Sequence, residues 1–317
     1  MNDKFYLITE DLGNLVRHFL LRDGSQETRD LPTDKILVAP RRLLQTEIKH
    51  LLQEHRVLVF KEAYFRARLN DQVDKNRSAD RLVVAMDYYA SKPDYILHIT
   101  RVSIPDQNAP GKWVKINDPR HRPGELSVAD QVRSISNIAK QNQKDIVLVD
   151  DGIWSSGTFE HIIKLFAENN VRVVKIVAGI VAKKDLTDSS ILDRTDFLHS
   201  FESKNMADWI CERDFFIGSP FFGRTLGTNG GSEPDPRGIG IPYCQPLGDC
   251  DWASIDPARA QAFSQLCIKA SKSLFLEIEK HLGRQIMVGE LRTMPLGAHR
   301  QPQMPFVDWL DQLAGQI

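Results

Sequence analysis

The chain has 317 residues, of which 42% are hydrophobic, and its formal net charge is -1. This length and composition allow one large α/β domain or two smaller ones, and the balanced charge argues against a general polyanion binder such as a DNA-coating protein. No apolar run approaches the roughly 20 residues that a membrane span needs, and the N-terminal stretch has acids where a signal peptide has an apolar core. We therefore expect a soluble, cytoplasmic protein with no membrane partner and no general nucleic-acid binding.

The cysteines show no C-x-x-C spacing and no histidine beside them at ligand distance. They are Cys211, Cys244, Cys250 and Cys267. In a chain without an export signal, we expect reduced thiols in the core or on the surface.

Apolar spacing predicts several elements in the first part of the chain. They are a strand at 4–9, a short helix at 10–22, a strand at Lys35–Ala39, a helix that Pro40 opens, and a strand at Arg56–Phe60. The segment from Lys61 to Arg81 is charged and lacks a clean period, so it predicts a mobile loop with helical pieces.

Two apolar runs, Leu82–Met86 and Tyr95–Val102, predict buried or half-buried strands. A polar stretch with four prolines then extends from Pro105 to Pro123. Ser127 has the character of a helix N-cap, with Asp130 three residues later in a weaker version of the capping box. The apolar face that follows predicts a helix leading into the next strand.

The most informative stretch lies between Asp145 and Lys183. The run Ile146–Val149 predicts a strand, and Val171–Val181 is so continuously apolar that it predicts a second, buried one. A loop rich in small and hydroxyl residues and an amphipathic helix connect them. Such a β-α-β crossover is almost always parallel and right-handed. Because both strands are apolar on both faces, we expect this unit at the centre of a sheet.

The last part of the chain carries an aromatic segment, Trp209–Gly227, and a further apolar run at Ile239–Tyr243. Asp256 and Pro257 form an N-cap and first-turn pair, which opens a long helix that Gly283 ends. A short amphipathic patch at 306–313 follows a proline-rich tail.

Acids at the end of the strand Ile146–Val149 indicate a binding site. In open α/β sheets, ligands bind outside the carboxyl ends of the strands, where loops lead to helix N-termini. Free N–H groups and the helix dipole there attract a phosphate, and the carboxylates face hydroxyls or a cation. The pattern predicts a sugar-phosphate site; the alternative is that the acids cap a turn or face solvent.

This stretch resembles the signature of the type I phosphoribosyltransferases, in which an apolar strand is followed by two acids and a loop of small and hydroxyl residues. The corresponding residues are Asp150, Asp151, Gly152, Ile153, Trp154, Ser155, Ser156, Gly157 and Thr158. Gly152, Trp154 and Ser156 depart from the signature. Where the family has glycine, Ser156 adds a Cβ at a position that we expect to need positive φ, at a cost of roughly 1 kcal/mol.

The resemblance implies a role for each matching residue. Asp150 and Asp151 are expected to serve the ribose hydroxyls of phosphoribosyl pyrophosphate and its Mg²⁺, and are the candidate catalytic and metal residues. Ser155, Ser156, Gly157 and Thr158 are expected to hold the 5′-phosphate. Mg²⁺ suits this arrangement because few carboxylates plus substrate oxygens hold it.

Trp154 lies where purine-type members of the family often carry an acid that acts on the base. Its indole is expected either to stack on a ligand ring and close the pocket, or to pack against neighbouring elements. The replacement argues against a plain hypoxanthine or guanine enzyme.

Basic residues upstream of the motif are further candidates. Arg120, His121 and Arg122 match the position of a mobile basic loop that closes over pyrophosphate in orotate-type members; a solvated surface loop is the alternative. Arg41 and Arg42, at an expected helix start, are a rival pyrophosphate site.

The aromatic segment occupies the place where the family usually recognises the base. Phe215 is a candidate for stacking and Arg224 for contacting a carbonyl or phosphate. Core packing is the alternative for these aromatic side chains.

The expected fold is α/β, with a mostly parallel central sheet flanked by helices as in the phosphoribosyltransferases. We expect N-terminal hood elements at 1–80, a phosphoribosyltransferase-like core at 81–253, and a C-terminal helical extension and tail at 254–317. The expected function is the transfer of ribose 5-phosphate to a base-like acceptor. The alternatives are a nucleotide-binding sensor without turnover that acts through a protein partner, and a nucleotide N-glycosidic hydrolase. A homo-oligomer or a protein partner is compatible with each.

Overall fold

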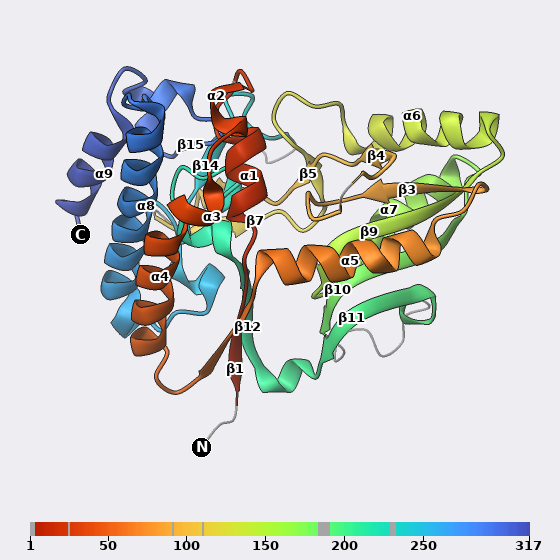
Figure 1. Ribbon diagram of the computed structural model, residues 1–317, viewed down its shortest axis with the longest axis horizontal. Coiled ribbons are helices and arrows are strands. Elements are labelled where there is room, and N and C mark those ends of the chain that lie inside the picture. The colour runs from red at the N-terminus through yellow and green to blue at the C-terminus, as the bar shows by residue number, and fades with distance from the viewer. Residues whose placement is uncertain (1–3, 25, 91, 110, 183–190, 229–232) are drawn as a thin grey trace. The chain divides into compact units, whose positions relative to one another are not determined.

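The computed structural model describes residues 4–24, 26–90, 92–109, 111–182, 191–228 and 233–317 (Figure 1). They divide into two compact units, which the chain enters and leaves more than once. Unit 1 comprises Met1–Phe60, Val102–Lys115 and Ala207–Ile317, and unit 2 comprises Lys61–Arg101 and Ile116–Met206. Parallel strands with flanking helices occur in both units, which confirms the α/β class. Within the described ranges, every helix is too short or too polar to cross a bilayer.

Unit 2 is built on a five-stranded sheet with the order β11-β10-β9-β3-β4. Every neighbouring pair in it is parallel. The strands are β3 (Arg81–Ala85), β4 (Tyr95–Ile96), β9 (Asp145–Ile153), β10 (Val173–Ala182) and β11 (Thr195–Phe201). The expected crossover from β9 to β10 is confirmed, and β9 is the central strand.

Helices cover both faces of this sheet. They are α5 (Glu62–Asn76), α6 (Val128–Gln141) and α7 (Gly157–Glu168). The apolar faces of α6 and α7 form one buried cluster with side chains such as Leu148 of β9 and Ile176 of β10. On α5, Phe65 packs against the backbone of β10 at Gly179. A small antiparallel pair, β5 (Ile99–Thr100) and β8 (Arg120–His121), completes unit 2.

Unit 1 contains two sheets. The first has the order β12-β1-β2, and the second has the order β15-β14-β13-β6-β7. The strands are β1 (Phe5–Thr9), β2 (Arg56–Phe60), β6 (Val102–Pro105), β7 (Trp113–Lys115), β12 (Met206–Cys211), β13 (Arg224–Leu226), β14 (Ile239–Ile241) and β15 (Met294–Pro295). β1 and β2 are parallel neighbours.

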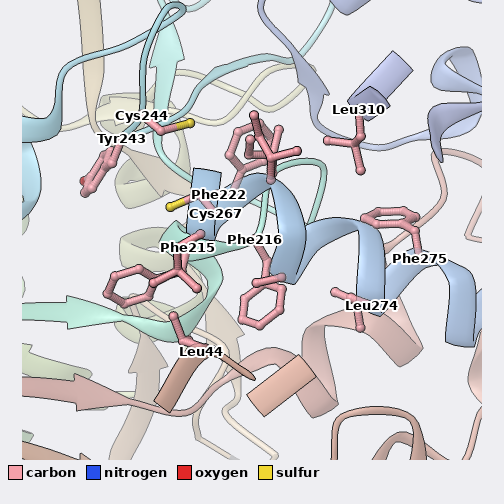
Figure 2. Packing of buried hydrophobic residues seen from close by; sticks show 14 of the residues in the cluster. Leu44, Phe215, Phe216, Phe222, Tyr243, Cys244, Cys267, Leu274, Phe275 and Leu310 are labelled. Atoms are coloured by element: carbon pink, nitrogen blue, oxygen red, sulfur yellow. The ribbon is translucent and has the colours of Figure 1, made fainter. Parts of the chain in front are cut away.

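The helices of unit 1 come from both ends of the chain. They are α1 (Leu12–Phe19), α2 (Gln26–Arg29), α3 (Thr33–Ile36), α4 (Val38–Leu51), α8 (Ala260–Leu282) and α9 (Phe306–Ala314). Figure 1 shows α4, α8 and α9 side by side, and their buried faces share one core. Figure 2 shows this core, with Phe215 between Leu44 of α4 and Cys267 of α8.

The free cysteines agree with the sequence prediction. Cys244, Cys250 and Cys267 are buried and Cys211 is half-buried. Burial raises the pKa of the thiols of Cys250 and Cys267, so these residues serve as packed core side chains rather than as reactive groups.

Two predicted segments in the first 81 residues are wrong. The strand expected at Lys35–Ala39 is helical, since α3 ends at Ile36 and α4 begins at Val38. Pro40 is tolerated there because the first N–H groups of a helix have no intrahelical partner. The loop expected from Lys61 to Arg81 contains the continuous helix α5. That helix buries a single row of apolar side chains spaced four residues apart, namely Phe65, Leu69 and Val73. Because the row is so narrow, the hydrophobic periodicity of the segment was weak.

Later predictions are mostly confirmed. Ser127 caps α6, accepting a hydrogen bond from the Asp130 N–H at 3.1 Å. Asp256 accepts one from the Ala258 N–H at 2.8 Å, at the turn that leads into α8. The strand expected at Tyr95–Val102 is instead divided among β4, β5 and β6, because the chain passes from unit 2 to unit 1 after Arg101.

Candidate functional site

The candidate site lies where β3 separates from β9. β3 pairs with β9 up to Val149, whereas β10 pairs with β9 as far as Ile153. In the sheet, β4 lies on one side of β3, and the later strands β9, β10 and β11 lie on the other side. The strand order therefore reverses between β3 and β9, and such a reversal is where open α/β sheets bind ligands.

The acid pair lies inside β9 rather than after it. Asp150 pairs with Ala178 of β10. The strand was expected to end at Val149, and this is where its pairing with β3 ends, but its pairing with β10 continues to Ile153. Asp150 is half-buried, and its Oδ1 accepts a hydrogen bond from the N–H of Asp151 at 3.0 Å. The Asp151 side chain is buried. Because successive strand residues point to opposite faces, the two carboxylates leave the strand in different directions.

Helix α5 packs closely against β10 beside the acid pair. A Cβ on Gly179 would lie 2.5 Å from the carbonyl oxygen of Asp151 and 2.1 Å from the ring of Phe65. Only glycine fits at this point of β10. The backbone at Asp151 is thus held by direct packing.

The loop after β9 leads into the first turn of α7. Trp154 is 38% exposed, Ser155 and Gly157 are exposed, and Ser156 and Thr158 are half-buried. Helix α7 starts at Gly157, and its first N–H groups have no intrahelical acceptor. The helix dipole adds partial positive charge at the same place, so hydroxyls, N–H groups and dipole all favour a phosphate.

The expected strain at Ser156 does not occur. Its φ is -72° and its ψ is -18°, which is ordinary right-handed backbone. A Cβ is therefore tolerated where the family has glycine. The predicted destabilisation of roughly 1 kcal/mol does not arise, because Ser156 does not have a positive φ. The loop keeps a regular helix start despite this departure.

The segment after β3 contributes residues that sequence reasoning missed. Asp87, Tyr88 and Tyr89 are all buried, and the Asp87 Oδ1 accepts a hydrogen bond from the N–H of Tyr88 at 2.6 Å. The Tyr89 ring packs edge-on against Phe65 at 5.0 Å. The available signal was that these polar and aromatic residues directly follow an apolar strand next to the motif strand.

The basic stretch is an ordered part of unit 2. Arg120 and His121 form β8, which pairs with β5. The N–H of Arg122 donates to the carbonyl of His98 at 2.8 Å, and its guanidinium lies 5.2 Å from the centre of the Tyr88 ring. Arg122 is thus joined to the segment after β3 through Tyr88.

His98 completes this group. Its Nδ1 lies 3.1 Å from the hydroxyl of Tyr88, and its N–H donates to Gln131 of α6 at 2.8 Å. Tyr88, His98 and Arg122 therefore form one contact cluster beside β3, fixed to α6. The cluster offers a cation, an imidazole and a phenol at the carboxyl side of the sheet.

Two predicted ligand residues belong to unit 1. Phe215 is fully buried in the core of that unit (Figure 2). Its ring centre lies 5.9 Å from that of Phe263. This is the packing role that the sequence left open as its alternative. Arg224 is half-buried, with its guanidinium 5.2 Å from the Trp252 ring.

The rival site at Arg41 is a structural ion-pair network. Two nitrogens of Arg41 each lie 2.7 Å from an oxygen of Glu212, and a third lies 3.4 Å from Glu10. Close by, Arg213 pairs with Asp11 at 3.0 Å. The network ties residues that follow β1 to residues that follow β12, so it joins distant parts of the chain.

The described residues contain no group of three or more His, Cys, Asp or Glu side chains arranged to hold a metal ion. Asp150 and Asp151 fit the weaker requirement of Mg²⁺ that arrives on a phosphorylated substrate, because such an ion keeps one or two carboxylates and substrate oxygens as ligands. The opposite directions of their side chains favour one direct carboxylate ligand at most.

Comparison with known proteins adds no relative. No protein-family model matches the chain, and neither a curated protein nor a solved structure is significantly similar to it.

Proposed function

We propose that unit 2 is a phosphoribosyltransferase-like domain that binds phosphoribosyl pyrophosphate or a nucleotide together with Mg²⁺. One observation carries the proposal: Asp150 and Asp151 lie where β3 separates from β9, immediately before an exposed hydroxyl loop that opens a helix. Two acids followed by a helix start support this proposal, because a ribose 5-phosphate carries hydroxyls for the acids and a phosphate for the helix start.

In this proposal, the residues of the loop hold the 5′-phosphate. Ser155 and Thr158 offer hydroxyls, and Gly157 offers an N–H without a Cβ. Asp150 accepts hydrogen bonds from the ribose hydroxyls and orients the sugar. Mg²⁺, when bound, neutralises charge on the pyrophosphate group.

The proposed reaction transfers the ribose 5-phosphate. The bond from C1 of the ribose to the pyrophosphate oxygen breaks, pyrophosphate leaves with the electron pair, and an acceptor nitrogen forms the new bond and loses its proton. Arg122, in its cluster with Tyr88 and His98, supplies fixed positive charge on the β3 side. Preorganised charge of this kind stabilises the departing anion.

The direct test is pyrophosphate release. The whole chain is incubated with phosphoribosyl pyrophosphate, Mg²⁺ and a panel of nucleobases and related nitrogen acceptors. The expected result is release that depends on one acceptor and is lost in the Asp150→Asn/Asp151→Asn variant. Calorimetry of phosphoribosyl pyrophosphate binding to the same variant separates lost binding from lost chemistry.

A matched control lies at the other end of the same strand. Asp145 pairs with the exposed Arg172 at 2.6 Å, so Asp145→Asn removes a carboxylate of β9 away from the proposed site. Its binding and activity should equal those of the wild type. Equal binding by the wild type and the Asp150→Asn/Asp151→Asn variant would refute the proposed site.

Two other outcomes would change the proposed activity. Binding of a nucleotide with a raised melting temperature, but no pyrophosphate with any acceptor, would identify a sensor without turnover. Release of a free base from a nucleotide in water would identify an N-glycosidic hydrolase.

A further inference from the structure

Two arginines of unit 1 lie side by side in a short antiparallel contact. Leu21 and Leu291 form an isolated antiparallel bridge and are buried. The N–H of Arg22 donates to the carbonyl of Glu290 at 2.8 Å, and the N–H of Arg292 donates to the carbonyl of Leu20 at 3.0 Å. The bridge therefore brings together two arginines that are 270 residues apart in the sequence.

Within the described ranges, neither guanidinium pairs with a carboxylate. The Arg22 Nε donates to the Leu291 carbonyl at 2.9 Å, and its Nη2 donates to the Arg237 carbonyl. The Arg292 Nη2 donates to the Arg22 carbonyl at 3.2 Å. The Arg292 Nε is buried without a hydrogen-bond partner in this part of the chain. Burial, and then the charge of Arg292, lower the pKa of Arg22, as expected for like charges held close.

Two acids in this part of unit 1 already pair with other arginines. Glu290 is the backbone partner of Arg22, but its carboxylate lies 2.9 Å from Arg284 and accepts the N–H of Met287 at 2.7 Å. Asp235 is likewise engaged by Arg237 at 2.7 Å. Asp23 raises the pKa of Arg22, but it is the smallest of the causes, after burial and Arg292, which lower it. The two arginines thus retain positive charge that their surroundings do not balance.

Arg292 lies beside an aromatic pair. The Arg292 guanidinium lies 5.8 Å from the centre of the Phe19 ring, and that ring lies 5.4 Å from Phe221. Phe221 has a positive φ of 61°, and its N–H donates to the Thr293 Oγ1 at 3.0 Å. A non-glycine residue in left-handed backbone stores strain, which is concentrated at binding sites.

We propose that Arg22 and Arg292 bind the phosphate group of a small-molecule ligand on unit 1. Their hydrogen bonds go to neutral backbone carbonyls, so both guanidinium groups keep their charge, and two such charges match a phosphate better than a single carboxylate. The proposal concerns unit 1 and does not rest on the phosphoribosyltransferase-like function of unit 2.

The test uses inorganic phosphate as the probe, titrated by calorimetry into the whole chain at constant ionic strength. Because phosphate would also occupy the proposed loop of unit 2, the background variant is Ser155→Ala/Thr158→Ala. This background should still bind phosphate. Adding Arg22→Gln and Arg292→Gln should weaken binding about tenfold or more, since charge-assisted hydrogen bonds are lost.

Arg237→Gln is the matched control, because it removes a nearby arginine whose charge Asp235 already balances. Its phosphate affinity in the same background should be unchanged. Arg284→Gln should weaken binding, because it frees Glu290 to pair with Arg22. Circular dichroism checks the fold of each variant, because the Arg22 side chain also donates to the carbonyls of Leu291 and Arg237.

Three results would overturn the proposal. They are a background variant that no longer binds phosphate, equal affinity with and without both arginines, and unchanged affinity in the single Arg22→Gln variant. Failure here leaves the pyrophosphate assay of unit 2 unaffected, because that assay depends on Asp150 and Asp151.

Discussion

Single side chains set the local boundaries and charges of unit 2. At the start of α6, the Ser127 hydroxyl donates to the Asp130 carboxylate at 2.6 Å while accepting the Asp130 N–H. The bond from Ser127 is the main cause of the lowered pKa of Asp130. A reciprocal pair of this type satisfies a helix N-terminus that otherwise has free N–H groups.

Removal of this cap should destabilise the fold. We expect Ser127→Ala to lower the free energy of unfolding by about 1 kcal/mol, measured by urea denaturation. Ser134→Ala is the control, because Ser134 lies in the same helix and its hydroxyl donates to the carbonyl of Asp130 rather than capping a free N–H group. It should be neutral or slightly stabilising, since alanine is the better helix former. Equal losses in both variants would contradict the capping role.

His199 of β11 should make stability depend on pH. Burial, and then the charge of Arg68, lower the pKa of His199. As the pH falls through the ordinary histidine value of about 6.5, the unfolded chain takes up a proton before the folded one. The free energy of unfolding therefore decreases with falling pH until the folded-state pKa is passed.

The measurement is the free energy of unfolding from pH 8 downward. His199→Gln should show a shallower loss below about pH 6.5, although His299, whose pKa is also lowered by burial and by Arg237, keeps part of the slope. The exposed His50 on α4 provides the control variant His50→Gln, which should retain the wild-type slope. An unchanged slope in His199→Gln would show that its neutral form is not favoured by folding.

At the scale of elements, glycines of the same unit have opposite surroundings. Gly179 on β10 faces Phe65 of α5 and the backbone of Asp151, whereas a Cβ on Gly157 at the start of α7 would meet nothing within 4 Å. Packing leaves no space for a larger residue at Gly179, whereas there is space for a Cβ at Gly157. This difference separates a structural glycine from one that leaves space for a ligand.

Gly179→Ala should be strongly destabilising. We expect a loss of about 1–3 kcal/mol from overpacking, because the Cβ would clash with a backbone carbonyl that has no alternative position. Urea denaturation measures the loss, and Gly157→Ala should leave stability unchanged or slightly improved. Similar stability of both variants would show that α5 can move away from β10.

Gly157→Ala also tests the ligand side of the same element. If a phosphate approaches the first turn of α7, the added Cβ should weaken binding of phosphoribosyl pyrophosphate while the fold stays stable. Calorimetry and urea denaturation on one preparation distinguish the two effects. Unchanged binding would place the phosphate away from this turn.

At the scale of the whole molecule, the core of unit 1 depends on both ends of the chain. Phe306 of α9 is fully buried against Phe275 of α8, with ring centres 4.4 Å apart. The same core includes Leu44 of α4 and Tyr6 of β1. The last helix is therefore part of the core of unit 1 and not an appendage.

Phe306→Ala should destabilise unit 1 selectively. We expect a loss of about 3–5 kcal/mol and faster amide hydrogen exchange in α4 and α8, with α6 and α7 of unit 2 less affected. Mass spectrometry of exchanged peptides measures this pattern. Asp308→Asn, at an exposed position on the same helix, should leave exchange unchanged. Equal acceleration in both units would show that they unfold as one.

Several features followed from the sequence because local chemistry determines them. The motif strand and the helix after it were predicted because a continuous apolar run and a 3.6-residue period are properties of neighbouring residues. The caps at Ser127 and Asp256 were predicted for the same reason. The acid pair and the hydroxyl loop of the candidate site were likewise readable, since they adjoin one another in the chain.

Other features were decided only by tertiary structure. The narrow buried row of α5 and the helical start at Val38 depend on what lies against them, so their apolar patterns were ambiguous. The contacts of Arg122 with Tyr88 and of Arg22 with Arg292 join residues that no local pattern connects. Phe215 shows the limit most clearly: its aromatic ring suited stacking or packing equally, and only burial in the core of unit 1 decided between them.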